Sequence, residues 1–100
     1  MDNFTILVIY KAKNEGDREA FVKELAEKGV LDAIRVENGC LNYDYYFSNE
    51  DKCKLVLFEK WETKEHQKVH MTQPHMKLAM EIKSKYIECA ELKQIDIKNL

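Results

Sequence analysis

The chain has 100 residues, of which 45% are hydrophobic and 34% charged, and its formal net charge at neutral pH is −2. This composition is typical of one soluble domain spanning residues 1–100, and it argues against a basic nucleic-acid-binding surface. No apolar run approaches the ~20 residues of a membrane span, and the N-terminus lacks the pattern of a signal peptide. Three cysteines without CxxC spacing predict reduced thiols, and we therefore expect a cytoplasmic protein.

The first third of the chain predicts a strand followed by helical structure. Phe4 to Tyr10 is an apolar run with β-branched members, and it is too short for a lone helix. From Asp17 onward, apolar residues recur at three- and four-residue spacing, which predicts an amphipathic helix. Gly29 is expected to kink or end this helix, because glycine is unfavourable in a helix interior. Helical structure then resumes toward Val36.

The middle of the chain has the alternation of a β-hairpin. Asn38-Gly39 is a stop signal, and the tyrosine-rich segment from Cys40 to Phe47 alternates between two faces. A polar loop, 48–51, leads to a return strand from Cys53 to Trp61. One face of this return strand carries Leu55, Leu57, Glu59 and Trp61.

Two short helices and a final strand complete the prediction. Thr63 is the expected N-cap of a helix over Lys64 to Met71, and Pro74 fits the first turn of the next helix. A last strand is expected over Tyr86 to Ile97. With the two short helices counted as one layer, this order predicts an α+β, ferredoxin-like split βαβ fold with an antiparallel sheet. Helices would cover one sheet face only, which leaves the other for a partner or a ligand.

Three segments resemble the antibiotic-biosynthesis monooxygenase (ABM) family, and in particular its quinol monooxygenase branch. They are residues 37–43 (ENGCLNY), like E-x-G-C-x-x-Y; 59–62 (EKWE), like E-x-W-E/D; and 70–77 (HMTQPHMK), like H-x-x-T/S-P-H-M/F-K. The chain is also similar to enzymes that process autoinducer-2 phosphate. The resemblance implies a dimeric α/β barrel with a pocket between sheet and helices in each subunit. It further implies oxidation of aromatic polyols or quinols by molecular oxygen, without flavin, haem or metal.

His70 and His75 are the candidate catalytic residues. They flank the predicted helix junction at Pro74, and histidine titrates near neutral pH, which suits proton abstraction or anion stabilisation. The alternative is that both rings cap helix ends or bond backbone carbonyls. A metal set is a further alternative, because His66 precedes His70 by four residues and either His75 or Glu62 would supply a third ligand. The segment lacks the HExxH pattern, so we expect no metal.

Five further residues are candidates for substrate binding. Trp61 would stack on an aromatic ring or else anchor the core or a dimer interface, and Glu59 would need a partner if buried. The amide of Asn42 would orient a substrate oxygen, whereas Tyr43 points to the opposite face and is also an ordinary strand residue. Met76 belongs to a methionine group that suits either the core or an adaptable apolar pocket.

The sequence favours a cofactor-independent monooxygenase acting on an aromatic polyol or quinol as a homodimer. A second hypothesis is an isomerase or processing enzyme for a small phosphorylated sugar-like ligand, as in the autoinducer-2-phosphate relatives. Such an enzyme needs a phosphate site, for which four lysines without a clear cluster are available: Lys60, Lys64, Lys68 and Lys77. A third hypothesis is a non-enzymatic or haem-binding dimeric module. We expect neither nucleic acid nor membrane as a partner.

Overall fold

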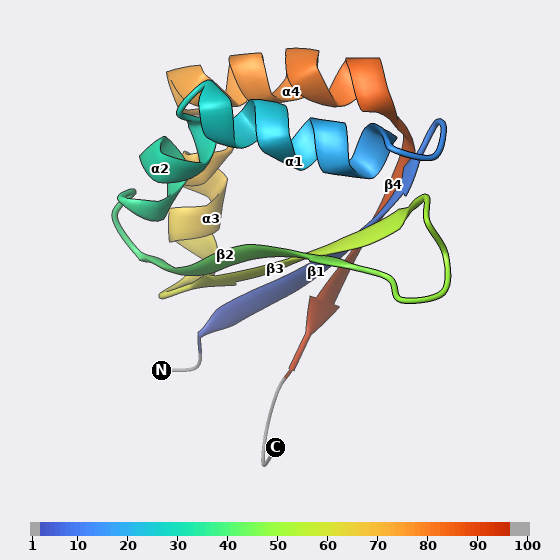
Figure 1. Ribbon diagram of the computed structural model, residues 1–100. Coiled ribbons are helices and arrows are strands. Elements are labelled where there is room, and N and C mark those ends of the chain that lie inside the picture. The colour runs from blue at the N-terminus through green and yellow to red at the C-terminus, as the bar shows by residue number, and fades with distance from the viewer. Residues whose placement is uncertain (1–2, 97–100) are drawn as a thin grey trace.

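The computed structural model describes residues 3–96, in which one layer of helices lies on a twisted antiparallel sheet (Figure 1). In chain order the elements are β1 (Phe4–Ala12), α1 (Asp17–Glu27), α2 (Val30–Arg35), β2 (Cys40–Phe47), β3 (Lys54–Trp61), α3 (Lys64–His70), α4 (Pro74–Tyr86) and β4 (Ile87–Ile95). The strands are arranged in the order β2-β3-β1-β4, and each neighbouring pair is antiparallel. This is the predicted ferredoxin-like α+β fold.

The core lies between the helices and the sheet face that they cover. Strand alternation sends every second residue of β1 and β3 into it, and the buried set includes Ile6, Val8, Tyr10, Leu55, Leu57 and Trp61. The helices contribute Phe21, Leu25, Val30, Ile34, Met76 and Ile82. Each such side chain contributes roughly 1.5–3 kcal/mol by burial. The longest helix, α4, has 13 residues, and no helix among residues 3–96 is long and apolar enough to cross a membrane.

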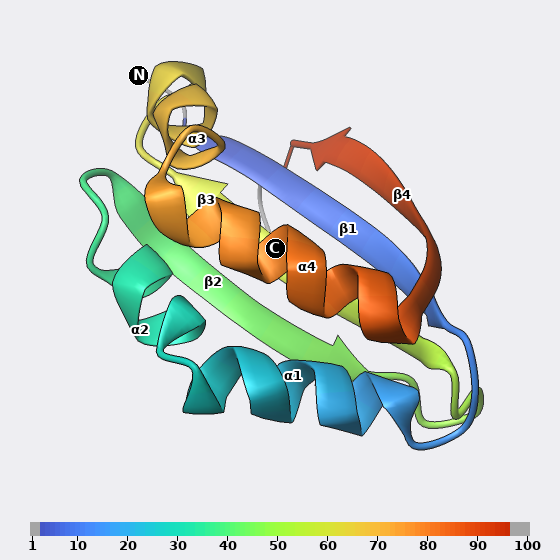
Figure 2. The same ribbon diagram turned by 90° about the horizontal axis from the view of Figure 1, so that it is seen from above.

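The helices leave β4 uncovered. Viewed from above, α4 crosses β3 and β1, α1 runs outside β2, and no helix lies over β4 (Figure 2). Accordingly, the side chains of residues 88–94 are exposed, including those that point to the same face as the core. This uncovered strip borders the site described below.

Several element boundaries differ from the prediction: β1 continues to Ala12, β3 begins at Lys54, and α3 ends at His70. Tyr86 is the last residue of α4 and not the first of a strand, because the helix continues until its backbone becomes extended at Ile87. Ile97, the predicted end of the last strand, lies outside the described residues. The expectation that Gly29 would kink or end the first helix is met by an end, since its left-handed conformation (φ +77°) separates α1 from α2.

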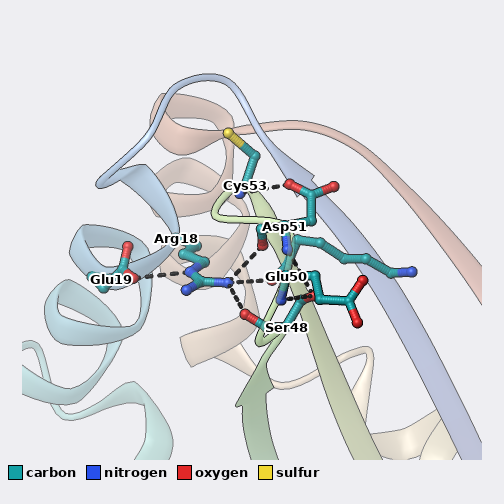
Figure 3. Close-up of polar contacts among 7 residues, drawn as sticks. Arg18, Glu19, Ser48, Glu50, Asp51 and Cys53 are labelled. Carbon is teal, nitrogen blue, oxygen red and sulfur yellow. Dashed lines mark hydrogen bonds and ion pairs between the residues drawn. The ribbon is translucent and has the colours of Figure 1, made fainter.

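Arg18 joins α1 to the loop of the β2–β3 hairpin (Figure 3). Its Nη1 donates hydrogen bonds to the backbone oxygens of Ser48, Asp51 and Lys54, at 3.0, 2.8 and 2.9 Å. The guanidinium also lies 4.8 Å from the ring centroid of Phe47. A charged donor that satisfies three carbonyls replaces the hydrogen bonds that this loop would otherwise make with water. The hairpin is therefore held against α1 at its loop end.

Gly39 connects the turn before β2 to α3. It has a φ of +85°, and a Cβ added there would lie 2.8 Å from the Cβ of His66 and closer still to its ring. The backbone oxygen of Gly39 also accepts a hydrogen bond from the Glu62 amide, at 2.8 Å. Only a residue without a side chain fits both the conformation and the space.

We predict that Gly39→Ala lowers the free energy of unfolding by more than the left-handed conformation alone explains. That conformation costs about 1–2 kcal/mol for an alanine, and displacing His66 adds to it. Gly29→Ala is the matched control, because Gly29 has a similar φ of +77° but nothing within 4 Å of an added Cβ. Urea denaturation measures both variants, and an equal loss of stability would contradict the close approach of α3.

Candidate active site

A cavity of about 240 Å³ lies between the helix-covered sheet face and the helices α3 and α4. Its wall is mostly apolar and aromatic and includes Val8, Phe21, Leu25, Ile34, Met76 and Ala79, together with polar groups from Tyr10, Tyr43, Tyr45, Glu59, His70 and Lys83. Three half-exposed apolar residues also line it: Met71, Met80 and Leu92. Met71 follows α3, Met80 lies in the middle of α4 and Leu92 belongs to the uncovered β4, so the mouth of the cavity lies beside β4.

His70 is the buried imidazole of this cavity. It is the last residue of α3, its side chain is 1% exposed, and its Nδ1 lies 3.0 and 3.2 Å from the two carboxyl oxygens of Glu37. The ring packs on Trp61 at 4.7 Å and on Tyr43 at 5.6 Å between centroids. An ionised carboxylate only accepts hydrogen bonds, so in a contact with ionised Glu37 the nitrogen that donates is Nδ1.

His75 contacts the same carboxylate from the first turn of α4. Its Nε2 lies 2.6 Å from Oε2 of Glu37, and the side chain is 23% exposed. His75 is not among the residues that line the cavity. Glu37 therefore joins the two predicted histidines, with only one of them at the cavity wall.

Glu59 is the buried carboxyl group of the cavity wall. It pairs with Tyr43 across β2 and β3, and the indole Nε1 of Trp61 donates a hydrogen bond to its Oε1, at 3.0 Å. Burial raises the pKa of Glu59 above its ordinary value, while the Trp61 hydrogen bond and the nearby His70 act in the opposite direction. Burial thus disfavours the charged form of this carboxyl group, which lies at the cavity wall.

Three tyrosine rings make up another part of the wall. Tyr43 and Tyr45 meet edge to face at 6.1 Å, and Tyr10 lies 6.0 Å from Tyr45. Burial raises the pKa of all three phenols well above the ordinary value, so they stay neutral. Their hydroxyl groups can donate to a substrate oxygen without adding negative charge to the site.

The structure brings together some of the predicted site residues and separates others. Four line the cavity: Tyr43, Glu59, His70 and Met76. Three do not: Asn42, Trp61 and His75. The amide of Asn42 donates to the backbone oxygen of Phe58, at 2.9 Å, and points to the opposite sheet face. Glu37 is the residue that the prediction of site residues missed, although it opens the first segment that resembles the ABM family.

The alternative metal set is not assembled as the spacing suggested. His66 turns away from His70, and its Nδ1 lies 2.7 Å from Thr63 Oγ1, the side chain that caps α3. Its Nε2 lies 3.9 Å from Glu62. Within residues 3–96, no three His, Cys, Asp or Glu side chains are arranged to hold a metal ion.

The fold and the site define a ferredoxin-like α+β protein with an apolar cavity next to a buried histidine. The chain belongs to the antibiotic biosynthesis monooxygenase family, whose sequence pattern matches residues 4–82. A comparison with curated protein sequences finds no match.

Solved structures share this fold at low sequence identity. A Pseudomonas aeruginosa protein has a TM-score of 0.82 and 20% identity, over 99% of this chain and 97% of its own. A Nitrosomonas europaea protein has a TM-score of 0.79 and 22% identity, over 93% and 88%. SnoaB, a cofactor-independent oxygenase from Streptomyces nogalater, has a TM-score of 0.80 and 10% identity, over 100% and 97%. These similarities establish the fold.

We predict that Glu59→Gln removes a pH-dependent destabilisation. A carboxyl group with a raised folded-state pKa contributes its full stability below the ordinary value of 4.5 and loses it as pH rises toward the folded-state pKa. Glutamine does not titrate and still accepts from Trp61. Urea denaturation between about pH 4 and pH 8 should show that the free energy of unfolding of the variant increases relative to that of the wild type as pH rises. Glu62→Gln, at an exposed carboxylate, is the control, and a wild-type–Glu59→Gln difference that is constant with pH would contradict the prediction.

Proposed function

We propose that the protein is a cofactor-independent monooxygenase that oxidises an aromatic polyol or quinol with molecular oxygen. The observation that carries the proposal is the position of His70, which lies at the wall of an apolar cavity with Nδ1 bonded to Glu37. A neutral imidazole in this state offers Nε2 as a base to a hydroxyl group in the cavity. The family of the chain supports an oxygenase.

The size of the cavity favours a small aromatic substrate. A cavity of about 150 Å³ accommodates benzene, so the 240 Å³ here suits a compound of one or two rings. A larger ring system would extend past the apolar mouth at Met71, Met80 and Leu92. We therefore place benzene and naphthalene quinols ahead of three-ring substrates.

The reaction needs no electrons beyond those of the substrate. A quinol with one free ring position and one O₂ give a hydroxyquinone and one water. His70 accepts a hydroxyl proton, and the resulting anion reduces oxygen. A carbon–oxygen bond then forms at the ring, the O–O bond breaks, and the second oxygen atom leaves as water. The protein binds the ring, moves protons and stabilises the anion.

The other candidate residues have different roles in this proposal. Tyr43 donates a hydrogen bond to the substrate oxygen, Glu59 lies in the same wall, and Met76 packs against the ring. Trp61 acts from beneath His70 by stacking on its imidazole and by holding Glu59. Asn42 has no part in the cavity, because its amide is bonded to the strand backbone on the other face.

The cavity wall favours this function over the sugar-phosphate alternative. Among the residues that line it, Lys83 is the cation, whereas a phosphate group is ordinarily bound by several donors and positive charges. None of the four lysines considered from the sequence lines the cavity. Thermal-shift screening with sugar phosphates, and a visible spectrum after incubation with haem, test the two alternatives.

A second copy of the chain is the expected partner, and the uncovered sheet face is its expected contact. No helix of residues 3–96 lies on this face, and it carries the apolar side chains of Leu7, Ile9, Val56 and Phe58, with Tyr46 57% exposed beside them. Each subunit would be one domain of a dimeric α/β barrel. The thiols of Cys40, Cys53 and Cys89 are free in the described residues. A cytoplasmic location remains part of the proposal.

We predict that the protein sediments as a dimer of twice its 11.8 kDa chain mass. Phe58→Lys places a charge in the middle of the proposed contact and should yield monomers, because burying an unpaired charge is costly. Val36→Lys is the control, since Val36 is 83% exposed and lies outside the sheet. Sedimentation velocity distinguishes the outcomes, and a monomeric wild type would refute the dimer.

We predict oxygen uptake with benzene or naphthalene quinols above the rate of their autoxidation, and incorporation of one atom of ¹⁸O from labelled O₂. His70→Phe keeps a ring on Trp61 but removes the base, and it should lower kcat by about 10²–10⁴-fold. His66→Phe is the matched control outside the cavity and should retain activity. Turnover of no quinol above autoxidation, or equal rates in the wild type and His70→Phe, would refute the proposed function.

A further inference from the structure

Glu37 lies in the hydrogen-bonded turn between α2 and β2. Its amide donates to the backbone oxygen of Ile34, at 3.0 Å, and its own backbone oxygen accepts from the amide of Cys40, at 3.1 Å. The side chain is only 9% exposed. A carboxylate fixed by its backbone and removed from water is costly unless hydrogen bonds satisfy it. The donors it has found are the imidazoles of His70 and His75.

We propose that Glu37 is a positioning residue that fixes the two histidines in opposite tautomers, so that His70 is the base of the site and His75 is not. This inference rests on the proposed function for its catalytic meaning, but the tautomers themselves are a property of the protein without substrate.

The geometry assigns each proton. Glu37 faces Nδ1 of His70 and Nε2 of His75, and because the carboxylate only accepts, these two nitrogens carry the hydrogens. Neutral His70 therefore has its lone pair on Nε2, and neutral His75 has its lone pair on Nδ1. His70 lines the cavity and His75 does not. Of the two histidines, His70 is the one with a free basic nitrogen at the cavity wall.

Glu37 also balances the charge that forms on His70 during the reaction. When Nε2 takes the substrate hydroxyl proton, the ring becomes an imidazolium 3.0 Å from the Glu37 carboxylate. The rings of Tyr43 and Trp61 pack on the imidazole, and Glu59 is hydrogen-bonded to Trp61, so Glu37 is the carboxylate in direct contact with His70. The same proton then returns to the oxygen that leaves as water. His75 keeps Glu37 in place through the second hydrogen bond.

The tautomers are measured directly by long-range ¹H–¹⁵N correlation on ¹⁵N-histidine-labelled protein without substrate, at about pH 8, where ordinary imidazoles are neutral. We expect His70 protonated at Nδ1 and His75 protonated at Nε2. His66, the third histidine of the chain, is an internal reference, because its Nδ1 faces Thr63 and not Glu37. A wild-type His70 protonated at Nε2 overturns the proposal whether or not any substrate is found.

Variants of Glu37 test the positioning role. Glu37→Leu keeps the bulk but has no acceptor, so the signals of His70 and His75 should both change to a mixture of tautomers while His66 keeps its pattern. With a quinol that the wild type turns over, kcat should fall about 10- to 100-fold with little change in KM. Glu37→Asp, which retains the carboxylate, should recover the His70 pattern and part of kcat.

Glu62→Gln is the matched control, because it removes a carboxylate from an imidazole, His66, outside the cavity. It should leave the His70 and His75 tautomers and kcat unchanged. An unchanged His70 tautomer in Glu37→Leu overturns the proposal. Should no quinol react, the proposed function fails while the tautomer result still decides the role of Glu37. Should Glu37→Leu not fold, the wild-type spectrum and Glu37→Asp decide it.

Discussion

The hydrogen-bonded contact of the Glu37 carboxylate with two imidazoles is the interaction on which the site depends. It joins the turn after α2 to the end of α3 and to the start of α4, three segments that pack at one end of the sheet. A buried carboxylate tolerates little displacement, because losing either donor leaves charge without compensation. The helix junction is therefore held at the position where His70 reaches the cavity.

The remainder of the fold keeps the cavity open and accessible. Arg18 holds the far hairpin loop against α1, so the tyrosine-bearing part of β2 stays in the wall. At the other end, Gly39 lets α3 approach the turn before β2 closely through His66. Because no helix covers β4, access remains between Met80 and Leu92. The cavity is thus open to solvent because the helices cover β2, β3 and β1 but leave β4 uncovered (Figure 2).

Much of the site was predictable from strand alternation and from the family resemblance. Alternation placed Glu59 and Trp61 on one face of β3 and separated Tyr43 from Asn42 on β2, and the structure shows Tyr43 to be the buried one. Strand alternation could not distinguish a residue that lines the cavity from one that packs behind a lining residue. Trp61 shares the face of Glu59, yet α3 places His70 over the indole, so the indole supports the site from below. That distinction depends on where a helix lies, which period-two patterning does not encode.

The sequence alone determined the elements, their order and their apolar faces, because the periods of strands and helices depend only on neighbours along the chain. It also determined the family, through three short segments. Only the tertiary structure decided which histidine meets the cavity and which carboxylate binds it. Glu37 is 33 residues from His70 and 38 from His75. The contact depends on how α3, α4 and the turn before β2 pack together, and a local sequence period carries no information on such long-range packing.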